Sequence, residues 1–428
     1  MSYVIGVILF ALCILISVSL HEAGHMGTAK LFGMRVTRYF IGFGPTIWSF
    51  RRGETEYGFK WLPFGGFVKI TGMTEQEEDE EEVPPEDMHR VFWRKPLWQR
   101  TLVLAAGSVT HFVLGFLILW ILVAFVAAPN PAYAQEVSTS TAVVVSPCLT
   151  QPDPAECTDA DEPSPAAAAG LRDGDRVVAV NGKQIAGERC LLPDAISGTE
   201  PTSWTCAVLA IRALPADQPA DLVIERDGES MTIPVTPHTV EIPTSDGGVQ
   251  KLNQIGIAQQ APVGVAATIT YGPVEGVGAA VDLTGDMAVR MAEAVTRIPE
   301  KVPALWNAII GEERDAETPV SVVGASRLGG EMVENEAWAS FFLLLATLNY
   351  FIGLFNLVPL LPMDGGHIAI AWYERVRSWW AAKRRRPDPG RVDYLKLMPL
   401  TYTVLIIMVG FTLLTVTADI VNPITIFK

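Results

Sequence analysis

The first apolar stretch of the sequence, roughly residues 3–20, lacks the basic residues that open a secretory signal peptide. It also lacks a small-x-small cleavage site, because the polar run His21-Glu-Ala-Gly-His25 follows Leu20 directly. These two absences argue against a leader that is removed after export. We therefore expect this stretch to be retained as a membrane-spanning segment.

Charge is scarce in this chain, since Asp, Glu, Lys and Arg make up 18% of the 428 residues while 49% are hydrophobic. Apolar residues are concentrated in four stretches, roughly 3–20, 101–128, 337–362 and 397–418. A helix of about 20 apolar residues crosses the ~30 Å hydrocarbon core of a bilayer. One such stretch could belong to a soluble core, but four predict an α-helical polytopic membrane protein with about four transmembrane helices.

The charges that are present predict which segments face the cytoplasm. Residues 367–396 contain 8 Lys or Arg against 3 Asp or Glu, whereas residues 129–340 contain 12 against 30. Residues 27–100 are balanced, with 11 of each kind. Short loops rich in Lys and Arg stay on the cytoplasmic side. We therefore expect a multi-pass protein of the cell membrane, with 367–396 inside and 129–340 outside.

Cysteine is also rare, and four of the five cysteines lie in the predicted outer segment. Cys13 falls in the first apolar stretch, where the role of a small buried residue is expected. An even number of cysteines outside the cytoplasm indicates disulfides. Pairing between sequence neighbours, one of three possible connectivities, would join Cys148 to Cys157 and Cys190 to Cys206.

The run His21-Glu-Ala-Gly-His25 fits the pattern H-E-x-x-H and continues the first apolar stretch. On a helix, residues four apart share a face, so both imidazoles can bind one Zn²⁺ at about 2.0–2.1 Å. Glu22 between them is placed to act as a general base rather than as a ligand. Because ionisable residues inside membrane helices are costly and usually functional, we interpret the run as a catalytic zinc motif.

A catalytic zinc ion needs a third protein ligand, and Asp364 is the strongest candidate. It lies in the run Asn356-Leu-Val-Pro-Leu-Leu-Pro-Met-Asp-Gly-Gly-His367, whose prolines interrupt a helix. HEAGH and Asp364 both come towards the cytoplasmic ends of spans that enter from outside, so one ion could join them. Asp364 could instead be a helix cap or an interface residue. His367 could replace it as ligand, although a position at the membrane interface suits His367 better.

The remaining segments have weaker patterns. Alternating apolar residues on both sides of Arg52-Gly-Glu54 predict a membrane-associated β-hairpin region over residues 34–73. An acidic cytoplasmic linker follows over residues 74–100. The expected transmembrane helices then occupy residues 1–33, 101–128, 337–366 and 397–420, and residues 367–396 form a basic cytoplasmic loop.

The run from Ala167 to Gly182, Ala-Ala-Ala-Gly-Leu-Arg-Asp-Gly-Asp-Arg-Val-Val-Ala-Val-Asn-Gly, resembles the signature of PDZ domains. This resemblance implies an extracytoplasmic PDZ-like α+β domain over residues 142–260. Residues 261–336 form a connector in which small and apolar residues recur at helical spacing. That spacing suits either an amphipathic helix on the outer membrane surface or a helix packed on the protein itself.

Several of these motifs occur together in one known family. The chain resembles the site-2 proteases, most closely the four-span bacterial sigma-E-type regulators of envelope stress and their actinobacterial relatives. The resemblance rests on HEAGH, Gly42-Phe-Gly-Pro45, Pro63-x-Gly-Gly-x-Val68, the PDZ-like insert and the run from Asn356 to Gly365, and it covers nearly the whole chain. It implies one catalytic zinc ion held by His21, His25 and Asp364, with Glu22 as catalytic base and Asn356 binding the substrate or the oxyanion.

One departure from the family lies in the second apolar stretch. There the sequence Gly107-Ser-Val-Thr-His111 stands in place of the usual Gly-Pro-x-x-Asn motif. We interpret His111 either as an intramembrane polar partner of the zinc site or as a packing histidine.

The expected function is that of an intramembrane zinc metalloendopeptidase. By family analogy, its substrates are single-span proteins already trimmed on the outer face, such as anti-sigma factors. The PDZ-like domain would bind a new carboxyl terminus or exclude untrimmed substrates by bulk. Lipid surrounds the spans, and no nucleic-acid partner is expected.

Two other functions are consistent with a zinc motif in a membrane protein. A non-catalytic zinc-containing scaffold or peptide-binding receptor would need no base at Glu22. A zinc transporter would need several intramembrane acids along a path, whereas only Glu22 and Asp364 lie at depth in this sequence.

Overall fold

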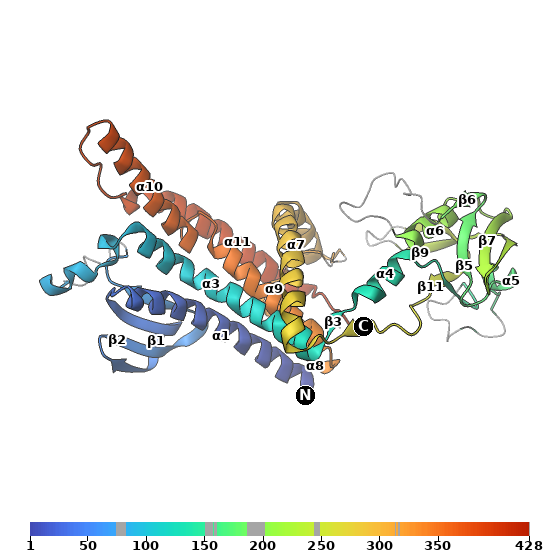
Figure 1. The fold of residues 1–428 in the computed structure, drawn as a ribbon, viewed down its shortest axis with the longest axis horizontal. Helices are drawn as coiled ribbons and strands as arrows, with labels where there is room; N and C mark the ends of the chain where they lie inside the picture. The colour runs from blue at the N-terminus through green and yellow to red at the C-terminus, as the bar shows by residue number, and fades with distance from the viewer. Residues whose placement is uncertain are drawn as a thin grey trace. The chain divides into compact units, whose positions relative to one another are not determined.

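The computed structural model describes residues 1–73, 83–149, 157, 161–185, 202–243, 249–312, 314–315 and 317–427. The chain forms two compact units (Figure 1). The first consists of Met1–Ala127 together with Thr270–Lys428, and the second of Ala128–Ile269. The first unit holds the apolar helices and the predicted zinc motif.

Four helices among the described residues are long and apolar enough to cross a membrane. They are α1 (Ser2–Leu31), α3 (Leu97–Ile121, continued by the π-helical turn η3, Leu122–Val126), α9 (Trp338–Asn356) and α11 (Met398–Val421, preceded by the 3₁₀ turn η5, Tyr394–Leu397). A helix is the form these stretches must take, because hydrocarbon offers the backbone no other hydrogen-bond partner. They match the four predicted spans, and the protein is a multi-pass membrane protein.

A β-hairpin follows α1, formed by β1 (Val36–Arg52) and β2 (Thr55–Ile70). Gly53 makes the turn between them at a φ of +65°, a conformation that glycine adopts without strain. Both strands bend, so that residues 38–41 pair with 56–59 on one side and with 66–69 on the other. The sequence predicted strands here, and the structure adds that residues 62–68 continue the same sheet.

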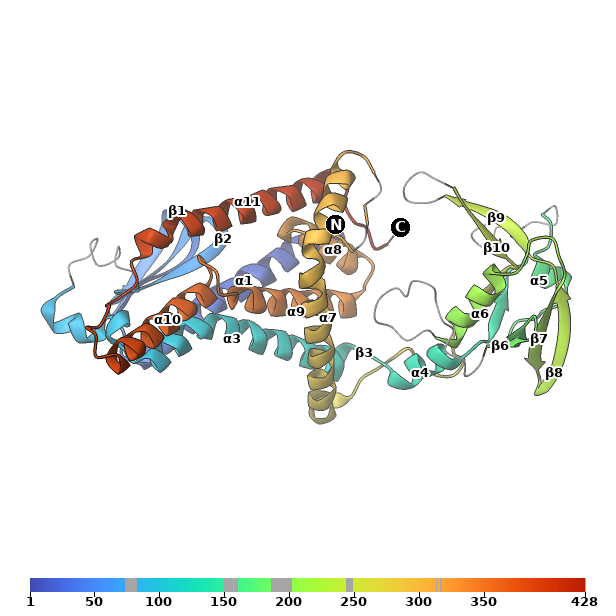
Figure 2. The same ribbon diagram turned by 90° about the horizontal axis from the view of Figure 1, so that it is seen from above.

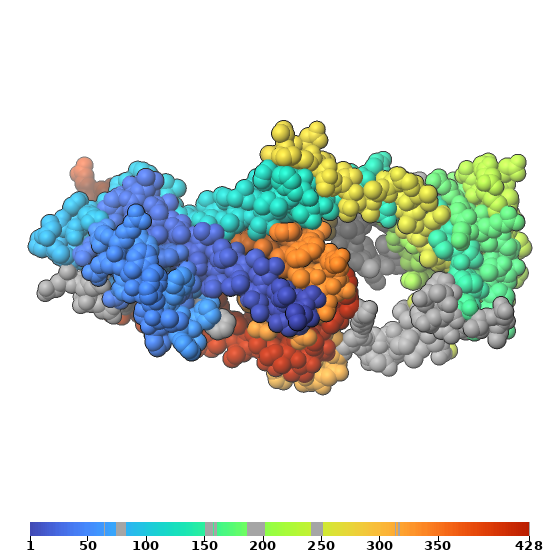
Figure 3. All heavy atoms as spheres, turned by 90° about the horizontal axis from the view of Figure 1, so that it is seen from below, coloured from blue at the N-terminus to red at the C-terminus, as the bar shows by residue number. Residues whose placement is uncertain are grey.

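The hairpin lies alongside α1, as the two blue segments of Figure 3 show. The Tyr39 hydroxyl donates to the carbonyl oxygen of Ser19 (2.7 Å), and Lys30 Nζ donates to the hydroxyl of Tyr57 (2.6 Å). Large aromatic side chains of both strands remain exposed, namely Phe43, Trp48, Phe50, Phe59 and Trp61. Exposed aromatic rings suit the interface of a membrane.

Two helices connect the second unit to the third span: α7 (Gly272–Ile309) and α8 (Val322–Glu334). α7 packs against α3, η3 and α11 and crosses them steeply (Figure 2). Its other side leaves apolar residues exposed, among them Val274, Val277, Val281 and Val289. α7 is therefore packed on the protein along one side, and contact of its exposed apolar side with the outer membrane surface stays a prediction.

A buried ion pair joins the connection between α7 and α8 to the end of α11. Arg314 Nη1 lies 2.6 Å from Asp419 Oδ1, and both side chains are 2% exposed. Asp419 Oδ2 also accepts a hydrogen bond from the backbone N–H of Ser321, the residue that caps α8 (2.7 Å). α8 in turn packs on α1, where Gly329 lies against Phe10 and Gly330 against Val7.

The second unit is built on a four-stranded sheet with the order β6-β5-β7-β8. These strands are β5 (Arg176–Val180), β6 (Lys183–Gln184), β7 (Ala220–Arg226) and β8 (Glu229–Val235). The core includes residues of α5 (Pro165–Ala168) and α6 (Ser203–Arg212). The other elements are α4 (Pro131–Thr139) and the strand pairs β3 (Ala128–Pro129) with β12 (Thr268–Ile269), β4 (Val143–Val145) with β11 (Ile257–Gln259), and β9 (His238–Pro243) with β10 (Val249–Gln254).

The cysteines of this unit agree with an oxidising compartment. Cys148 and Cys157 form a disulfide, as the sequence predicted. Cys206 is also disulfide-bonded, while Cys190, its predicted partner, lies outside the described residues. Cys13 is free and lies in α1.

A buried carboxylate stabilises the turn before β5. The side chain of Asp175 is 2% exposed and accepts hydrogen bonds from Arg226 Nε and Nη2, both at 2.7 Å. It also accepts from the backbone N–H of Arg172 (2.8 Å). Burial alone would raise the pKa of Asp175, but these donors hold that pKa below its usual value.

We expect Asp175→Asn to lower the thermal unfolding midpoint of this unit by several degrees, because a neutral amide loses the charge-assisted hydrogen bonds from Arg226. The depressed pKa means that the contribution of Asp175 is complete above its unfolded-state pKa of about 3.9 and is lost as the pH falls through the folded-state value. Melting curves of the full chain should therefore differ at neutral pH and converge in strong acid. Asp221→Asn, at an exposed position of β7, is the control, and equal midpoints for both variants at neutral pH would contradict this role.

Candidate metal centre

Both histidines of the predicted zinc motif lie in the interior of the first unit. His21 and His25 are one turn apart on α1 and are 7% and 6% exposed. Their Nε2 atoms are 3.1 Å apart, so the two rings point at the same place. The helix thus presents both imidazoles as the spacing predicted.

The third predicted ligand, Asp364, is the first residue of α10 (Asp364–Lys383). Its Oδ2 lies 3.4 Å from His21 Nε2 and 3.3 Å from His25 Nε2. The structure therefore brings together His21, His25 and Asp364 from segments far apart in the sequence.

Two glycines allow the chain to turn tightly behind Asp364. A Cβ on Gly365 would collide with the carbonyl oxygen of Leu357, and one on Gly366 would lie 2.6 Å from the carbonyl carbon of Leu360. α9 ends at Asn356, and α10 then runs through much of the segment for which the sequence predicted a basic loop. Asp364 therefore sits at a helix start, delivered by a short non-helical connection.

The donor set fits a zinc ion. Among the described residues, His21, His25 and Asp364 form a group whose ligand atoms lie within 4.8 Å of one another. Bonds of about 2.0–2.1 Å in a tetrahedral site place ligand atoms about 3.3 Å apart, close to the 3.1, 3.3 and 3.4 Å between these atoms. Nitrogen and oxygen electron pairs that converge in this way repel one another unless a cation lies among them. Two imidazoles and a carboxylate are ligands that Zn²⁺ commonly takes.

The two histidines differ in what contacts the outer nitrogen of the ring. His25 Nδ1 lies 2.7 Å from the carbonyl oxygen of Val103 on α3, so Nδ1–H donates there and Nε2 keeps its electron pair. His21 Nδ1 is buried and has no hydrogen-bond partner among the described residues. Gly107, one turn beyond Val103, faces both rings, and a Cβ there would lie 2.6 Å from His21 Nδ1.

Glu22, the predicted base, lies against the hairpin. A Cβ on Gly66 of β2 would lie 3.2 Å from Glu22 Cγ. Asn356 is the last residue of α9 and is partly exposed, at the start of the connection that leads to Asp364. The catalytic roles of Glu22 and Asn356 remain predictions.

His111 lies beside the metal centre. Its ring centroid is 5.1 Å from that of His21, and its side chain is fully buried. His111 Nδ1 lies 3.0 Å from Oδ1 of Asn349 on α9, a residue that the sequence analysis did not single out. The signal that could have found Asn349 is a lone amide in an apolar span, two helical turns before Asn356.

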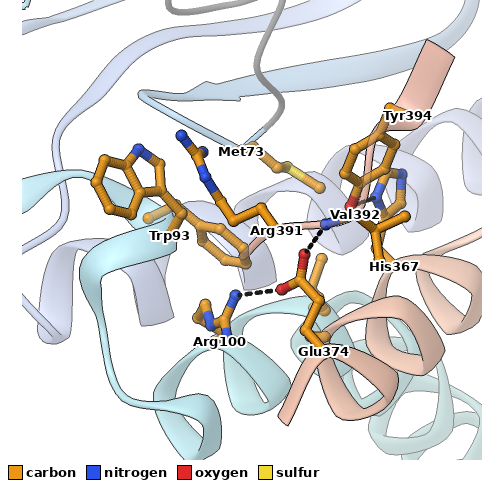
Figure 4. A pocket seen from close by; sticks show the side chains of 11 residues that line it. Met73, Trp93, Arg100, His367, Glu374, Arg391, Val392 and Tyr394 are labelled. Carbon is orange, nitrogen blue, oxygen red and sulfur yellow. Dashed lines mark hydrogen bonds and ion pairs between the residues drawn. The ribbon is translucent and has the colours of Figure 1, made fainter. Parts of the chain in front are cut away.

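His367, the alternative third ligand, faces a different hollow of the first unit (Figure 4). Its ring stacks on Tyr394, and its Nδ1 lies 3.5 Å from the Tyr394 hydroxyl oxygen. In the same hollow Glu374 forms an ion pair with Arg100 (3.6 Å) and accepts a hydrogen bond from the backbone N–H of Val392 (2.8 Å). These contacts hold α10 against the beginning of α3, and α10 carries Asp364.

Comparison with known proteins places this metal centre in a family. The model of peptidase family M50 matches residues 9–387, which include both histidines and Asp364. The chain belongs to peptidase family M50. It is 42% identical to the zinc metalloprotease Rip1 of Mycolicibacterium smegmatis and 40% identical to the zinc metalloprotease Rip1 of Mycobacterium tuberculosis, each over the full length of both chains. A putative zinc metalloprotease of Brucella suis is 27% identical over 93% of each chain.

These relatives identify the activity and the cofactor of this family M50 protein. It is a zinc metalloprotease, and zinc is its metal. The resemblance to the site-2 protease family is thereby confirmed.

Proposed function

We propose that this family M50 protease hydrolyses peptide bonds within the transmembrane segments of other membrane proteins, with His21, His25 and Asp364 as its zinc ligands. The observation that carries the proposal is the convergence of these three side chains beside apolar spans. Ionisable residues at such depth are costly and are retained for function. A protease whose metal lies there acts on substrates that are themselves in the membrane.

The chain supplies a base and a hydrogen-bond donor for peptide hydrolysis. When bound, zinc supplies Lewis-acid chemistry by polarising the scissile carbonyl and lowering the pKa of water. Glu22 takes a proton from the attacking water and delivers it to the leaving nitrogen, so that one water is consumed and a carboxyl group and an amine are formed. Asn356 donates through its amide to the substrate or to the developing oxyanion.

The hairpin is suited to hold a substrate in extended form. A peptide bond inside a transmembrane helix is already hydrogen-bonded, so it must be unwound before attack, and its backbone then needs new partners. In the described strands, residues 66–68 pair on one side with 39–41, which leaves an edge for an added strand. Gly66 lies beside Glu22, so a strand added at this edge would pass the base.

The charge layout supports an active site in the cytoplasmic half of the membrane, with Ala128–Ile269 outside. Basic residues dominate 367–396 and acidic residues dominate 129–340, as the positive-inside rule requires for this orientation. Water then reaches Glu22 from the cytoplasmic side.

We assign the second unit the role of a PDZ-like substrate filter. The PDZ-like run from Ala167 to Gly182 includes the end of α5 and all of β5, and it ends in a turn where Asn181 and Gly182 have φ of +49° and +79°. Such a unit captures a new carboxyl terminus by strand addition or excludes bulky untrimmed proteins. Single-span proteins trimmed on the outer face, such as anti-sigma factors, are the substrates that fit this arrangement.

A pair of single-span reporter proteins tests the proposal. The two share one transmembrane segment and differ in whether a folded domain or a short free end remains on the outer side. We expect the trimmed reporter to be cut within its apolar segment, and the untrimmed one to be cut at least about tenfold more slowly, equivalent to about 1.4 kcal/mol of discrimination. Mass spectrometry of the fragments locates the cut. Cleavage confined to residues outside the apolar segment would contradict intramembrane proteolysis.

A further inference from the structure

Three buried polar atoms of α1 and α3 have no hydrogen-bond partner among the described residues. They are His21 Nδ1, Ser108 Oγ and His111 Nε2. Leaving a polar group buried and unpaired costs about 1–3 kcal/mol. Two of these atoms belong to neighbouring rings at the metal centre, and Ser108 precedes His111 by about one helical turn, which indicates a hydrogen-bonded arrangement that serves the site.

The contacts of His111 define which of its ring nitrogens carries the proton. Asn349 Nδ2 donates to the carbonyl oxygen of Leu345 (2.9 Å), which orients the amide so that its Oδ1 faces His111. An amide oxygen can only accept, so His111 Nδ1 carries the hydrogen. In the neutral ring Nε2 then holds a free electron pair. Asn349 thus makes His111 Nε2, the ring nitrogen without a partner in the described part of the chain, a hydrogen-bond acceptor.

Among the residues that the structure describes, His21 lacks a hydrogen-bond acceptor, whereas His111 lacks a donor. Its Nε2 faces His25 and Asp364, so Nδ1 carries the hydrogen when Nε2 binds a metal. Metal-binding histidines almost always donate this second N–H to an acceptor, which orients the ring and increases its basicity. His25 has the carbonyl oxygen of Val103 for this purpose at 2.7 Å. For His21, the nearby ring of His111, with centroids 5.1 Å apart, offers the acceptor.

We propose that His111 is a positioning residue for the zinc ligand His21: its Nε2, oriented by Asn349, accepts the hydrogen of His21 Nδ1 through one buried water that Ser108 Oγ also contacts. Such a water would have three polar partners, the usual number for a buried water. The proposed series of hydrogen bonds then leads from the backbone of α9 to the metal ligand on α1. It joins Leu345, Asn349, His111 and His21 in that order. The inference rests on His21 being a zinc ligand, as proposed above.

The test compares two substitutions at His111 in the purified full-length protein. His111→Leu fills similar space but cannot accept a hydrogen bond, whereas His111→Gln keeps an oxygen near the position of Nε2. We expect His111→Leu to weaken zinc binding about 10- to 100-fold in competition with a chelator. His111→Gln should retain most of the affinity. The visible spectrum of the Co²⁺-substituted protein should change in His111→Leu and stay close to wild type in His111→Gln.

Asn349→Leu tests the same proposal a second way. It leaves His111 in place but removes the amide oxygen that keeps the hydrogen on His111 Nδ1. We expect it to weaken zinc binding less than His111→Leu does, with the same direction of change in the Co²⁺ spectrum. Wild-type zinc affinity in His111→Leu, or equal losses in His111→Leu and His111→Gln, would overturn the proposal. His21→Ala separates the two levels of inference: if it keeps wild-type zinc affinity, the ligand set itself is wrong.

Discussion

Replacing Glu22 by Gln should leave zinc in place and lower the rate of peptide cleavage by about 10²- to 10⁴-fold, the usual contribution of a general base. Gln has nearly the same size and shape as Glu, but its amide cannot take a proton from water. The exchange keeps the contact of this side chain with Gly66 of β2 and changes none of the three proposed ligands.

Two measurements are needed on the Glu22→Gln protein. Metal analysis should give wild-type zinc content, and the transmembrane reporter should remain uncut. In cells, the variant strain should accumulate membrane-bound stubs that the wild type removes, and quantitative proteomics of membranes would list them as candidate substrates. Glu275→Gln, at an exposed position of α7, is the matched control and should behave as wild type. If Glu22→Gln cut the reporter at the wild-type rate, Glu22 would not be the general base and the mechanism proposed here would be wrong.

Gly107→Ala should have the second largest effect, through the metal itself. An added Cβ would meet His21 Cε1 and His25 Nε2 and would lie 2.6 Å from His21 Nδ1, closer than real Cβ atoms approach other groups. α1 and α3 would have to separate, or the imidazoles would have to leave their positions. Overpacking of this kind costs about 1–3 kcal/mol, which corresponds to about 5- to 150-fold weaker zinc binding if it is felt in the metal-bound state.

The matched control for Gly107→Ala is Gly27→Ala. Gly27 lies on α1 two residues after His25, and a Cβ there would meet nothing within 4 Å. Since alanine is favoured over glycine within a helix, Gly27→Ala should keep wild-type zinc affinity and equal or higher stability. Zinc titration of both proteins against a chelator measures the contrast. Equal affinities in the two variants would show that the contact of α3 with the imidazoles is not rigid.

The parts of this protein that the sequence predicted are those specified by local patterns. Four apolar stretches predicted the spans, because length and hydropathy decide which segments enter a bilayer. The spacing of His21 and His25 predicted their shared face, because one helical turn brings them together. Asp364 could be found because prolines and paired glycines indicate a break in an apolar run. A carboxylate at such a break inside a membrane segment is usually functional.

The contacts that could not be predicted from the sequence depend on which elements pack against one another. Asn349 contacts His111 only because α9 packs on α3, and no pattern in the sequence around either residue predicts that these two helices are neighbours. Asp419 lies near the end of the fourth apolar stretch, and no local pattern there predicts the buried ion pair that it forms with Arg314. The pairing of residues 66–69 with residues 38–41 could not be predicted, because the bend that brings them together follows from tertiary packing and not from alternation.

The order of the proposed zinc ligands along the chain has a consequence for biosynthesis. His21 and His25 are made first, but Asp364 comes after the entire second unit and the connector helices. At about 5–20 residues per second, the ribosome needs on the order of 20 to 70 seconds to add the missing ligand. During that interval the nascent chain carries two of the three proposed ligands, His21 and His25, and lacks Asp364. With the ligand set proposed here, this protease therefore cannot become active until its own insertion is nearly complete.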